Sequence, residues 1–189
     1  MSFLIAAILL ALLVVTQPAN FGSIRYVIME QVGFILVFVA VLGRVWCTLY
    51  IAGRKNRELC IVGPYELCRN PLYLFSFLGL VGICLAAANI LLTILAAVVY
   101  LLYYHGVIRG EERRLAAIFA EDFARYVART PRFWPRWKIP RNAAILQVDS
   151  RIFTRSLAEV IWFLLAINLV EIIERVKLSH LFNGIVLPL

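Results

Sequence analysis

The feature that most constrains this chain is a nearly unbroken apolar run over residues 72–105, whose main polar interruption is Asn89. A membrane-spanning helix needs about 20 apolar residues, so the run holds two spans only if both are short. We therefore predict a helical hairpin that turns near residues 86–89. Small side chains in the run would let two helices approach closely. These residues are Gly79, Gly82, Ala86, Ala96 and Ala97.

The rest of the chain is similarly apolar. Hydrophobic residues make up 63% of its 189 residues and the mean hydropathy is +0.88, whereas soluble domains are ~45–50% apolar. We expect an integral membrane protein of one compact domain, with little room for a separate soluble domain. The predicted fold class is all-α. It is a polytopic bundle of about five membrane helices with a cytoplasmic amphipathic helix.

Three further segments are long and apolar. Residues 3–15 lack the basic start and cleavage site of a signal peptide, so we predict a first, short span there. Residues 27–52 form a second span, in which Arg44 is costly unless it reaches the headgroups, pairs with an acid or lines a polar cavity. Residues 152–177 form a last helix. It crosses the membrane, lies in the interface or packs against another copy, and the sequence leaves these alternatives and the oligomeric state open.

Positive charge is concentrated in two segments, residues 53–58 and 109–141, within a net charge of +8. Cytoplasmic loops carry an excess of Lys and Arg, and a hairpin begins and ends on the same side, so both segments are expected on the cytoplasmic face. We predict the inner (plasma) membrane of a prokaryote, with both basic segments facing the cytoplasm.

Residues 131–141 interleave aromatic, basic and proline side chains. This composition also occurs in nucleic-acid surfaces. In a membrane protein it predicts an interfacial belt on anionic headgroups, so membrane lipids are expected partners and nucleic acid is not. Four cysteines have neither CxxC spacing nor a metal-ligand pattern with a histidine, so reduced thiols and no metal site are expected. They are Cys47, Cys60, Cys68 and Cys84.

A polar break at residues 63–73 separates two apolar segments and ends in a helix-start signal. Asn70 is a favourable N-cap, and Pro71 suits the first helical position. A helix N-terminus beside Arg69 is a seat for an anion such as a carboxylate or phosphate. The alternative is that this segment only starts a membrane helix.

Residues 107–128 show helical periodicity and predict an amphipathic helix. Glu111 and Glu112 fall on opposite edges of its apolar stripe. Two acids near a helix start can simply interact favourably with the helix dipole. Alternatively, carboxylates that border an apolar face accept hydrogen bonds from hydroxyl or ammonium groups of a bound cofactor.

Together these motifs resemble the isoprenylcysteine carboxyl methyltransferase family and the related phospholipid N-methyltransferases. The resemblance covers roughly residues 40–136 and rests on the order and spacing of several short motifs. They are Gly43-Arg44-Val45-Trp46 with Gly53, Gly63-Pro64-Tyr65, Arg69-Asn70-Pro71-Leu72-Tyr73, Glu111-Glu112 with Leu115, Phe119 and Tyr126, and Arg132-Phe133-Trp134-Pro135.

The resemblance implies a membrane enzyme that transfers a methyl group from S-adenosylmethionine to a lipophilic acceptor, such as a prenylated or lipid substrate, that arrives from the bilayer. It also implies a cytoplasm-facing cofactor pocket, made from the break, the second helix of the hairpin and the Glu-Glu helix. One departure is Asn70, because the carboxyl methyltransferases usually have Arg-His-Pro here. Asparagine still caps the helix but does not titrate near neutral pH, which leaves the acceptor in doubt.

The resemblance also implies the roles of individual residues. Arg44 and Arg132 are the expected catalytic residues, which would orient an anionic acceptor. For Tyr104 and His105, packing at the membrane boundary is an equal alternative. The expected cofactor-binding residues are Tyr65, Arg69, Asn70, Pro71, Tyr73, Tyr104, His105, Glu111 and Glu112.

Three regions follow from this interpretation. Residues 1–52 hold the N-terminal membrane helices, residues 53–141 the methyltransferase-like core and residues 142–189 a C-terminal helical extension. Carboxylate O-methylation is the favoured reaction, and N- or S-methylation of a phospholipid or a small amine or thiol is the alternative. A membrane reductase that uses NADPH is more distant, since the chain has no Gly-x-Gly-x-x-Gly motif. A non-enzymatic membrane subunit is the other distant alternative.

Overall fold

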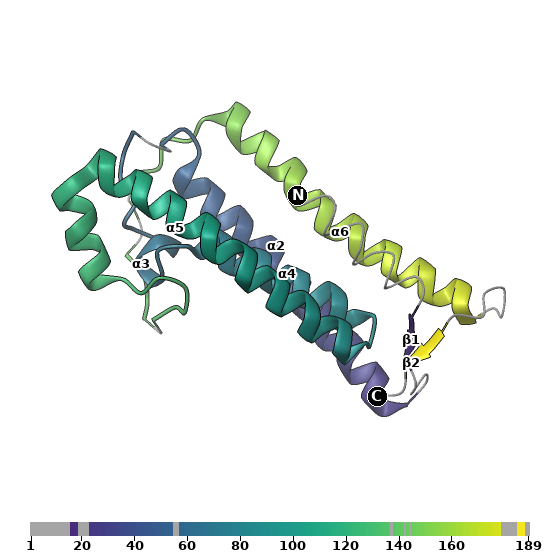
Figure 1. Cartoon of the computed structure of the whole chain (residues 1–189). Coiled ribbons are helices and arrows are strands. Elements are labelled where there is room, and N and C mark those ends of the chain that lie inside the picture. The colour runs from purple at the N-terminus through teal and green to yellow at the C-terminus, as the bar shows by residue number, and fades with distance from the viewer. Residues whose placement is uncertain are drawn as a thin grey trace. The chain divides into compact units, whose positions relative to one another are not determined.

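The computed structural model describes residues 16–18, 23–54, 57–136, 138–141, 143, 145–178 and 185–187. The predicted span at residues 3–15 lies outside them. The helices are α2 (Ile24–Ile51), α3 (Pro64–Leu67), α4 (Pro71–Ala86), α5 (Ile90–Arg129) and α6 (Ser150–Leu178) (Figure 1). Two three-residue strands, β1 (Thr16–Pro18) and β2 (Ile185–Leu187), pair in parallel, with Thr16 opposite Ile185. The predicted membrane helix bundle is confirmed.

Three of the described helices, α2, α5 and α6, are long and apolar enough to cross a membrane, and α4 is a shorter apolar helix of 16 residues. The chain is therefore a membrane protein. The predicted spans at residues 27–52 and 152–177 correspond to α2 and α6.

The predicted hairpin is confirmed, because α4 ends at Ala86 and α5 begins at Ile90. Between them Ala88 adopts a left-handed φ of 45°. The Asn89 side chain then caps α5, where its Oδ1 accepts from the backbone N–H of Leu92 at 2.9 Å. Asn89, the polar interruption in the apolar run, is thus the N-cap of the second helix of the hairpin.

The helix predicted at residues 107–128 is confirmed, but it does not start as a separate helix, because these residues continue the helical element α5, which extends from Ile90 to Arg129. Extending a helix adds one hydrogen bond per residue, whereas starting a new one requires a costly nucleus. Gly106 is tolerated inside the helix and does not end it. The break in helical geometry comes later, at Ala120, where φ is 38° and ψ is −108°.

The chain divides into two compact units, and several helices contribute a segment to each. Unit 1 comprises Met1–Val39, Phe77–Tyr100 and Trp162–Leu189. In it, Gly33 of α2 meets Gly82 and Ala86 of α4 so closely that a Cβ on Gly33 would lie 2.5 Å from the Ala86 nitrogen. The predicted role of small residues in close helix packing is thereby seen at Gly82 and Ala86. A buried cluster of Cys84, Ala87, Leu92, Ala96 and Val170 joins α4, α5 and α6.

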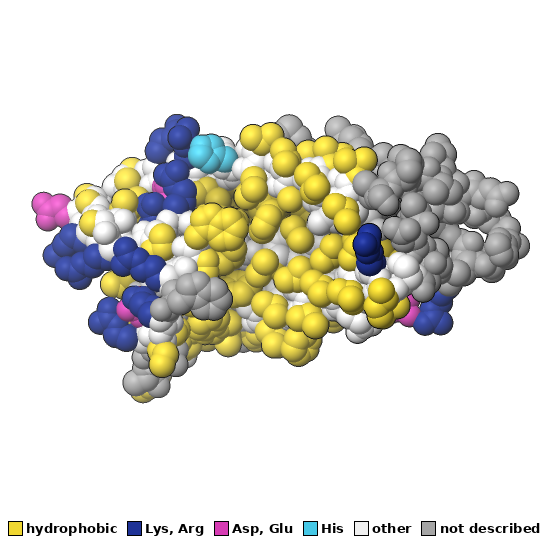
Figure 2. Space-filling model, turned by 90° about the horizontal axis from the view of Figure 1, so that it is seen from below, with side chains coloured by type: hydrophobic (Ala, Val, Ile, Leu, Met, Phe, Trp, Pro, Cys, Tyr) yellow, Lys and Arg dark blue, Asp and Glu magenta, His cyan; other side chains and the backbone are white. Residues whose placement is uncertain are grey.

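Unit 2 comprises Ala40–Ser76 and Leu101–Ile161, so it contains the end of α2, the start of α4, the end of α5 and the start of α6. Of the 19 Lys and Arg residues in the sequence, 16 fall in this unit. Figure 2 shows most of the blue Lys and Arg side chains gathered together, apart from a broad surface of hydrophobic side chains. Unit 2 has its own core, in which Cys47, Tyr50 and Tyr65 are buried.

Candidate active site

The polar break is held against the segment that follows α5. Three backbone hydrogen bonds join them: Gly63 donates to Arg141, Arg69 donates to Pro131 and Arg136 donates to Leu67, at N–O distances of 2.8–3.0 Å. We call residues 130–141 the strap. Gly63 permits this path because its φ of 61° suits glycine, and a Cβ there would lie 2.4 Å from the Tyr50 ring.

Glu66 of α3 fixes the strap through its side chain. This buried carboxylate accepts hydrogen bonds from the Lys138 ammonium at 2.9 Å, the Arg141 backbone N–H at 2.6 Å and the Arg141 Nε at 3.1 Å. The Arg141 N–H and the Lys138 ammonium stabilise the charged form and lower the pKa of Glu66 to about 2. The break and the strap thus form one structure around α3.

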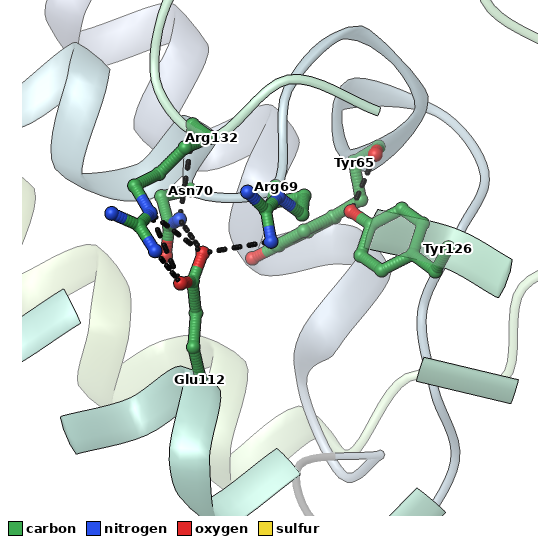
Figure 3. Close-up of polar contacts among 6 residues, drawn as sticks. All are labelled: Tyr65, Arg69, Asn70, Glu112, Tyr126 and Arg132. Atoms are coloured by element: carbon green, nitrogen blue, oxygen red, sulfur yellow. Dashed lines mark hydrogen bonds and ion pairs between the residues drawn. The ribbon is translucent and has the colours of Figure 1, made fainter. Parts of the chain in front are cut away.

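Glu112 is the centre of a charged cluster at the start of α4 (Figure 3). Glu112 is 9% exposed, and its carboxylate pairs with the Arg69 Nη1 at 3.1 Å and with Arg132 through Nε at 3.0 Å and Nη2 at 2.6 Å. The Asn70 amide donates to Glu112 at 3.5 Å and to the Arg132 carbonyl at 3.0 Å. Arg69, beside the predicted anion seat, therefore already pairs with a carboxylate of the chain itself.

Glu111 points in a different direction, since neighbouring helical side chains are about 100° apart. Its Oε2 accepts a hydrogen bond of 2.9 Å from the Tyr73 hydroxyl of α4. The Tyr73 ring also contacts the Tyr104 ring of α5, with centroids 5.2 Å apart. The two adjacent acids thus both connect α5 to the start of α4, one through an aromatic hydroxyl and the other through guanidinium groups.

A small cavity of about 90 Å³ lies within this arrangement. Tyr126, near the end of α5, is part of its lining and donates from its hydroxyl to the Tyr65 carbonyl at 2.7 Å (Figure 3). The cavity is lined by Ile51, Glu58, Leu59, Cys60, Tyr65, Arg69, Asn70, Leu72, Tyr73, Glu111, Leu115 and Tyr126.

Two polar atoms in the cavity lining are buried without a partner among the described residues: the Tyr65 hydroxyl and the Arg69 Nε. Burial raises the pKa of Tyr65, so its hydroxyl stays protonated. A buried polar group without a hydrogen-bond partner lowers the stability by about 1–3 kcal/mol, so a hydrogen bond from each atom to a ligand or a water would be favourable. Both are N–H or O–H groups, and both can donate to a bound oxygen.

The structure places the predicted site residues in three groups. Five of the eleven line the cavity: Tyr65, Arg69, Asn70, Tyr73 and Glu111. Three contact that group, namely the buried Pro71, which begins α4, Glu112, which pairs with Arg69, and Tyr104, whose ring contacts that of Tyr73 at a tilt. The remaining three, His105, Arg44 and Arg132, do not line the cavity.

These three have different surroundings. His105 is exposed. The Arg132 guanidinium lies against Glu112. Arg44, whose side chain is 13% exposed, donates to the Ser76 hydroxyl of α4 and to Glu159 of α6, the latter at 3.2 Å. Arg44 therefore pairs with an acid, one of the three possibilities that the sequence left open.

The sequence did not identify three residues as parts of the site: Tyr126, Ser76 and Glu159. Tyr126 had a signal, because it lies on the apolar stripe of α5 and carries a hydroxyl that burial forces to find a partner. Ser76 follows Tyr73 by three residues and so lies on a neighbouring part of the α4 surface. Glu159 lies 115 residues from Arg44 in the chain, and no local pattern predicts their contact.

Sequence comparisons identify the family of the chain. A sequence model of the phospholipid methyltransferase family matches residues 5–122. The chain is 41% identical over 148 residues to the cobalt-zinc-cadmium resistance protein CzcN of Cupriavidus metallidurans (strain CH34), covering 78% of this chain and 67% of that protein. It is also 41% identical over 149 residues to the nickel-cobalt-cadmium resistance protein NccN of Alcaligenes xylosoxydans xylosoxydans, covering 77% and 70%. No solved structure matches the chain significantly. The chain belongs to the phospholipid methyltransferase family, within the isoprenylcysteine carboxyl methyltransferase-like group of integral membrane methyltransferases.

Proposed function

We propose that this chain is a methyltransferase that uses S-adenosylmethionine and methylates a lipophilic acceptor from the bilayer. Family membership supports the methyl transfer. The observation that carries the choice of site is the cavity whose lining includes Glu111 together with Tyr65 and Arg69, two residues that each have a buried donor atom without a partner among the described residues.

The chemistry of the lining suits the cofactor. Arg69 can donate to the methionyl carboxylate, while Glu111 can accept from ribose hydroxyls or from the amino group. The faces of Tyr73 and Tyr104 suit a sulfonium through cation–π attraction. The cavity of about 90 Å³ is smaller than the ~300–1,000 Å³ of sites that enclose such ligands. Binding therefore requires lining side chains to move, and the Tyr73–Glu111 hydrogen bond is the contact that we expect to open.

The bound cofactor supplies an activated methyl group, so the protein has to position the acceptor and exclude water. Arg44 is the better placed of the two arginines to orient an anionic acceptor. It lies in a membrane helix and its present partner, Glu159, is 61% exposed, so an acceptor can replace that carboxylate. Arg132 instead positions Glu112. This favours O-methylation of a carboxylate on the cytoplasmic side of the inner membrane, with N- or S-methylation of a phospholipid, amine or thiol as the alternative.

The names of the two relatives suggest a biological setting, namely resistance to divalent metals. Both are named as resistance proteins for cobalt and cadmium, together with zinc or nickel. We propose that methylation by this chain supports growth in the presence of such divalent metals. A strain that lacks the gene should regain tolerance with the wild-type chain and not with Glu111→Ala. Equal rescue by the variant would show that any resistance does not need the proposed site.

Calorimetry tests the cofactor assignment directly. Purified protein in detergent should bind S-adenosylmethionine and its demethylated product, S-adenosylhomocysteine. Loss of one hydrogen bond to a charged group costs ~1.5–3 kcal/mol, so Glu111→Ala should weaken binding roughly 10- to 100-fold. Glu121→Ala is the matched control, since Glu121 is an exposed glutamate of the same helix. Binding of NADPH, with no heat from S-adenosylmethionine or S-adenosylhomocysteine, would instead support the reductase alternative.

A further inference from the structure

A second, larger hollow of about 790 Å³ lies along the strap and the end of α5. We call it the basic groove. It shares Glu58, Leu59 and Tyr126 with the small cavity but has a more charged lining. It is lined by Glu58, Leu59, Ile61, Glu66, Phe119, Asp122, Arg125, Tyr126, Arg129, Thr130, Arg136, Lys138 and Arg141. Five of these side chains are cationic and three are acidic, so the lining has a surplus of positive charge.

The acids of the groove neutralise particular cations. Glu66 pairs with both Lys138 and Arg141, and Asp122 pairs with Arg125. Arg129 and Arg136 make no ion pair among the described residues, and both are exposed. Glu58 pairs with Arg54, which does not line the groove. Two arginines of the lining thus have no ion-pair partner among the described residues, which favours an anionic ligand with several acceptor oxygens.

The strap and the segment after it also expose large apolar side chains. Trp134 is 69% exposed, Ile139 is 95% exposed and Ile145 is 81% exposed. These residues lie outside the helices, in the unit that gathers the ends of α2 and α5 and the starts of α4 and α6. Tryptophan and basic residues at the ends of membrane helices are typical of the headgroup region, where apolar side chains enter the acyl boundary.

We propose that the basic groove binds the headgroup phosphate of an anionic phospholipid through Arg129 and Arg136, while Trp134 and Ile139 contact the same lipid layer. A soluble phosphate compound would use the two arginines but would leave the apolar side chains in water. A lipid satisfies both features. This inference does not depend on the methyltransferase reaction, because it concerns residues that we assign no part in cofactor binding.

The test measures binding of fluorescent phosphatidylglycerol and phosphatidylcholine to the purified full-length protein in detergent micelles, by fluorescence anisotropy. The wild type should prefer phosphatidylglycerol. One basic residue near an anionic headgroup raises the affinity about fivefold. The double variant Arg129→Gln with Arg136→Gln should therefore bind phosphatidylglycerol roughly 25-fold more weakly than the wild type. Each single variant should lose about fivefold.

The matched control is Arg113→Gln with Arg114→Gln, which removes the same charge from exposed residues of α5 outside the groove lining. It should keep the wild-type preference. An equal loss in the control, or no preference for phosphatidylglycerol in the wild type, would overturn the proposal. Displacement of the labelled lipid by inorganic phosphate would assign the groove to a soluble anion instead. Displacement by S-adenosylhomocysteine would assign it to the cofactor. Either result would also overturn the proposal. Melting temperatures and circular dichroism should show that all variants are folded.

Discussion

The two units hold their helices together by different means. In unit 1, α2 and α4 touch through backbone atoms at Gly33 and Gly82, and an apolar cluster joins α4, α5 and α6. In unit 2, α4 and α5 are joined by the Glu112 cluster, and α3 is joined to the strap by Glu66. Lipid tails provide no hydrophobic force between apolar helices, so close packing of small residues has to hold them. Ion pairs between helices cost less free energy where water or lipid headgroups solvate the more exposed partner of each pair.

The two units also differ in which of them contains the candidate site. The five predicted site residues that line the cavity all belong to unit 2. In unit 1 the described polar cross-link is a 2.5 Å hydrogen bond from the Tyr26 hydroxyl to Glu174, which joins α2 to α6. Four perturbations test the comparison between the units.

Removing the Glu112 carboxylate should have the largest effect. Glu112→Ala leaves Arg69, whose side chain is 11% exposed, without its ion-pair partner. Loss of one member of a buried pair costs ~3–5 kcal/mol, and we expect the lower end because Arg132 is partly exposed. Denaturant unfolding in detergent measures this loss of stability. If Glu121→Ala destabilises the protein equally, the charged cluster does not hold unit 2 together.

Filling the helix contact in unit 1 should have a smaller effect. Gly33→Ala places a Cβ 2.5 Å from backbone atoms of α4, which have little room to yield. Overpacking of this kind costs ~1–3 kcal/mol. The control is Gly106→Ala, since no atom lies within 4 Å of a Cβ at that position in α5. That change should stabilise the helix by ~1 kcal/mol. Equal melting temperatures for the two variants would show that close backbone contact is unimportant here.

The Glu66 carboxylate should make the strap sensitive to acid. Its folded pKa is lowered from 4.5 to about 2, so its contribution to stability is complete above pH 4.5. The contribution is lost as the pH falls towards 2. In Glu66→Gln the acid-dependent loss over this interval should be smaller than in the wild type. Limited proteolysis within the strap as a function of pH provides the measurement. Identical pH profiles for the two proteins would remove Glu66 as the acid-sensitive contact.

The smallest effect concerns a thiol between α3 and α4. Burial raises the pKa of Cys68 to about 11, so at pH 8 roughly one thiol in a thousand is ionised. Alkylation of Cys68 by N-ethylmaleimide, followed by mass spectrometry of the peptides, should be slow in the folded protein and fast after unfolding. Rapid alkylation of the folded protein would mean that the break is open to water.

The sequence alone determined the features that depend on neighbouring residues. Apolar length identified the membrane helices, Asn89 marked the turn of the hairpin and Pro71 marked the start of α4. These signals are local, because capping and helix periodicity act over a few residues. The predicted start of the helix that carries Glu111 and Glu112 was wrong for a local reason too. Amphipathic character indicates which face of a helix lies at a surface and does not indicate where the helix begins.

Tertiary structure decided which charges meet. The sequence showed Arg69, Glu112 and Arg132 as separate motif residues, and it assigned Arg132 to the acceptor. Folding brings Arg69 and Arg132, which lie 43 and 20 positions from Glu112 in the chain, to its carboxylate, and their mutual attraction in a partly buried site sets their orientation. The contact between Arg44 and Glu159 likewise depends on where α6 packs. Local chemistry thus fixed the helices and their ends, whereas the pairing of charges required the fold that excludes water around them.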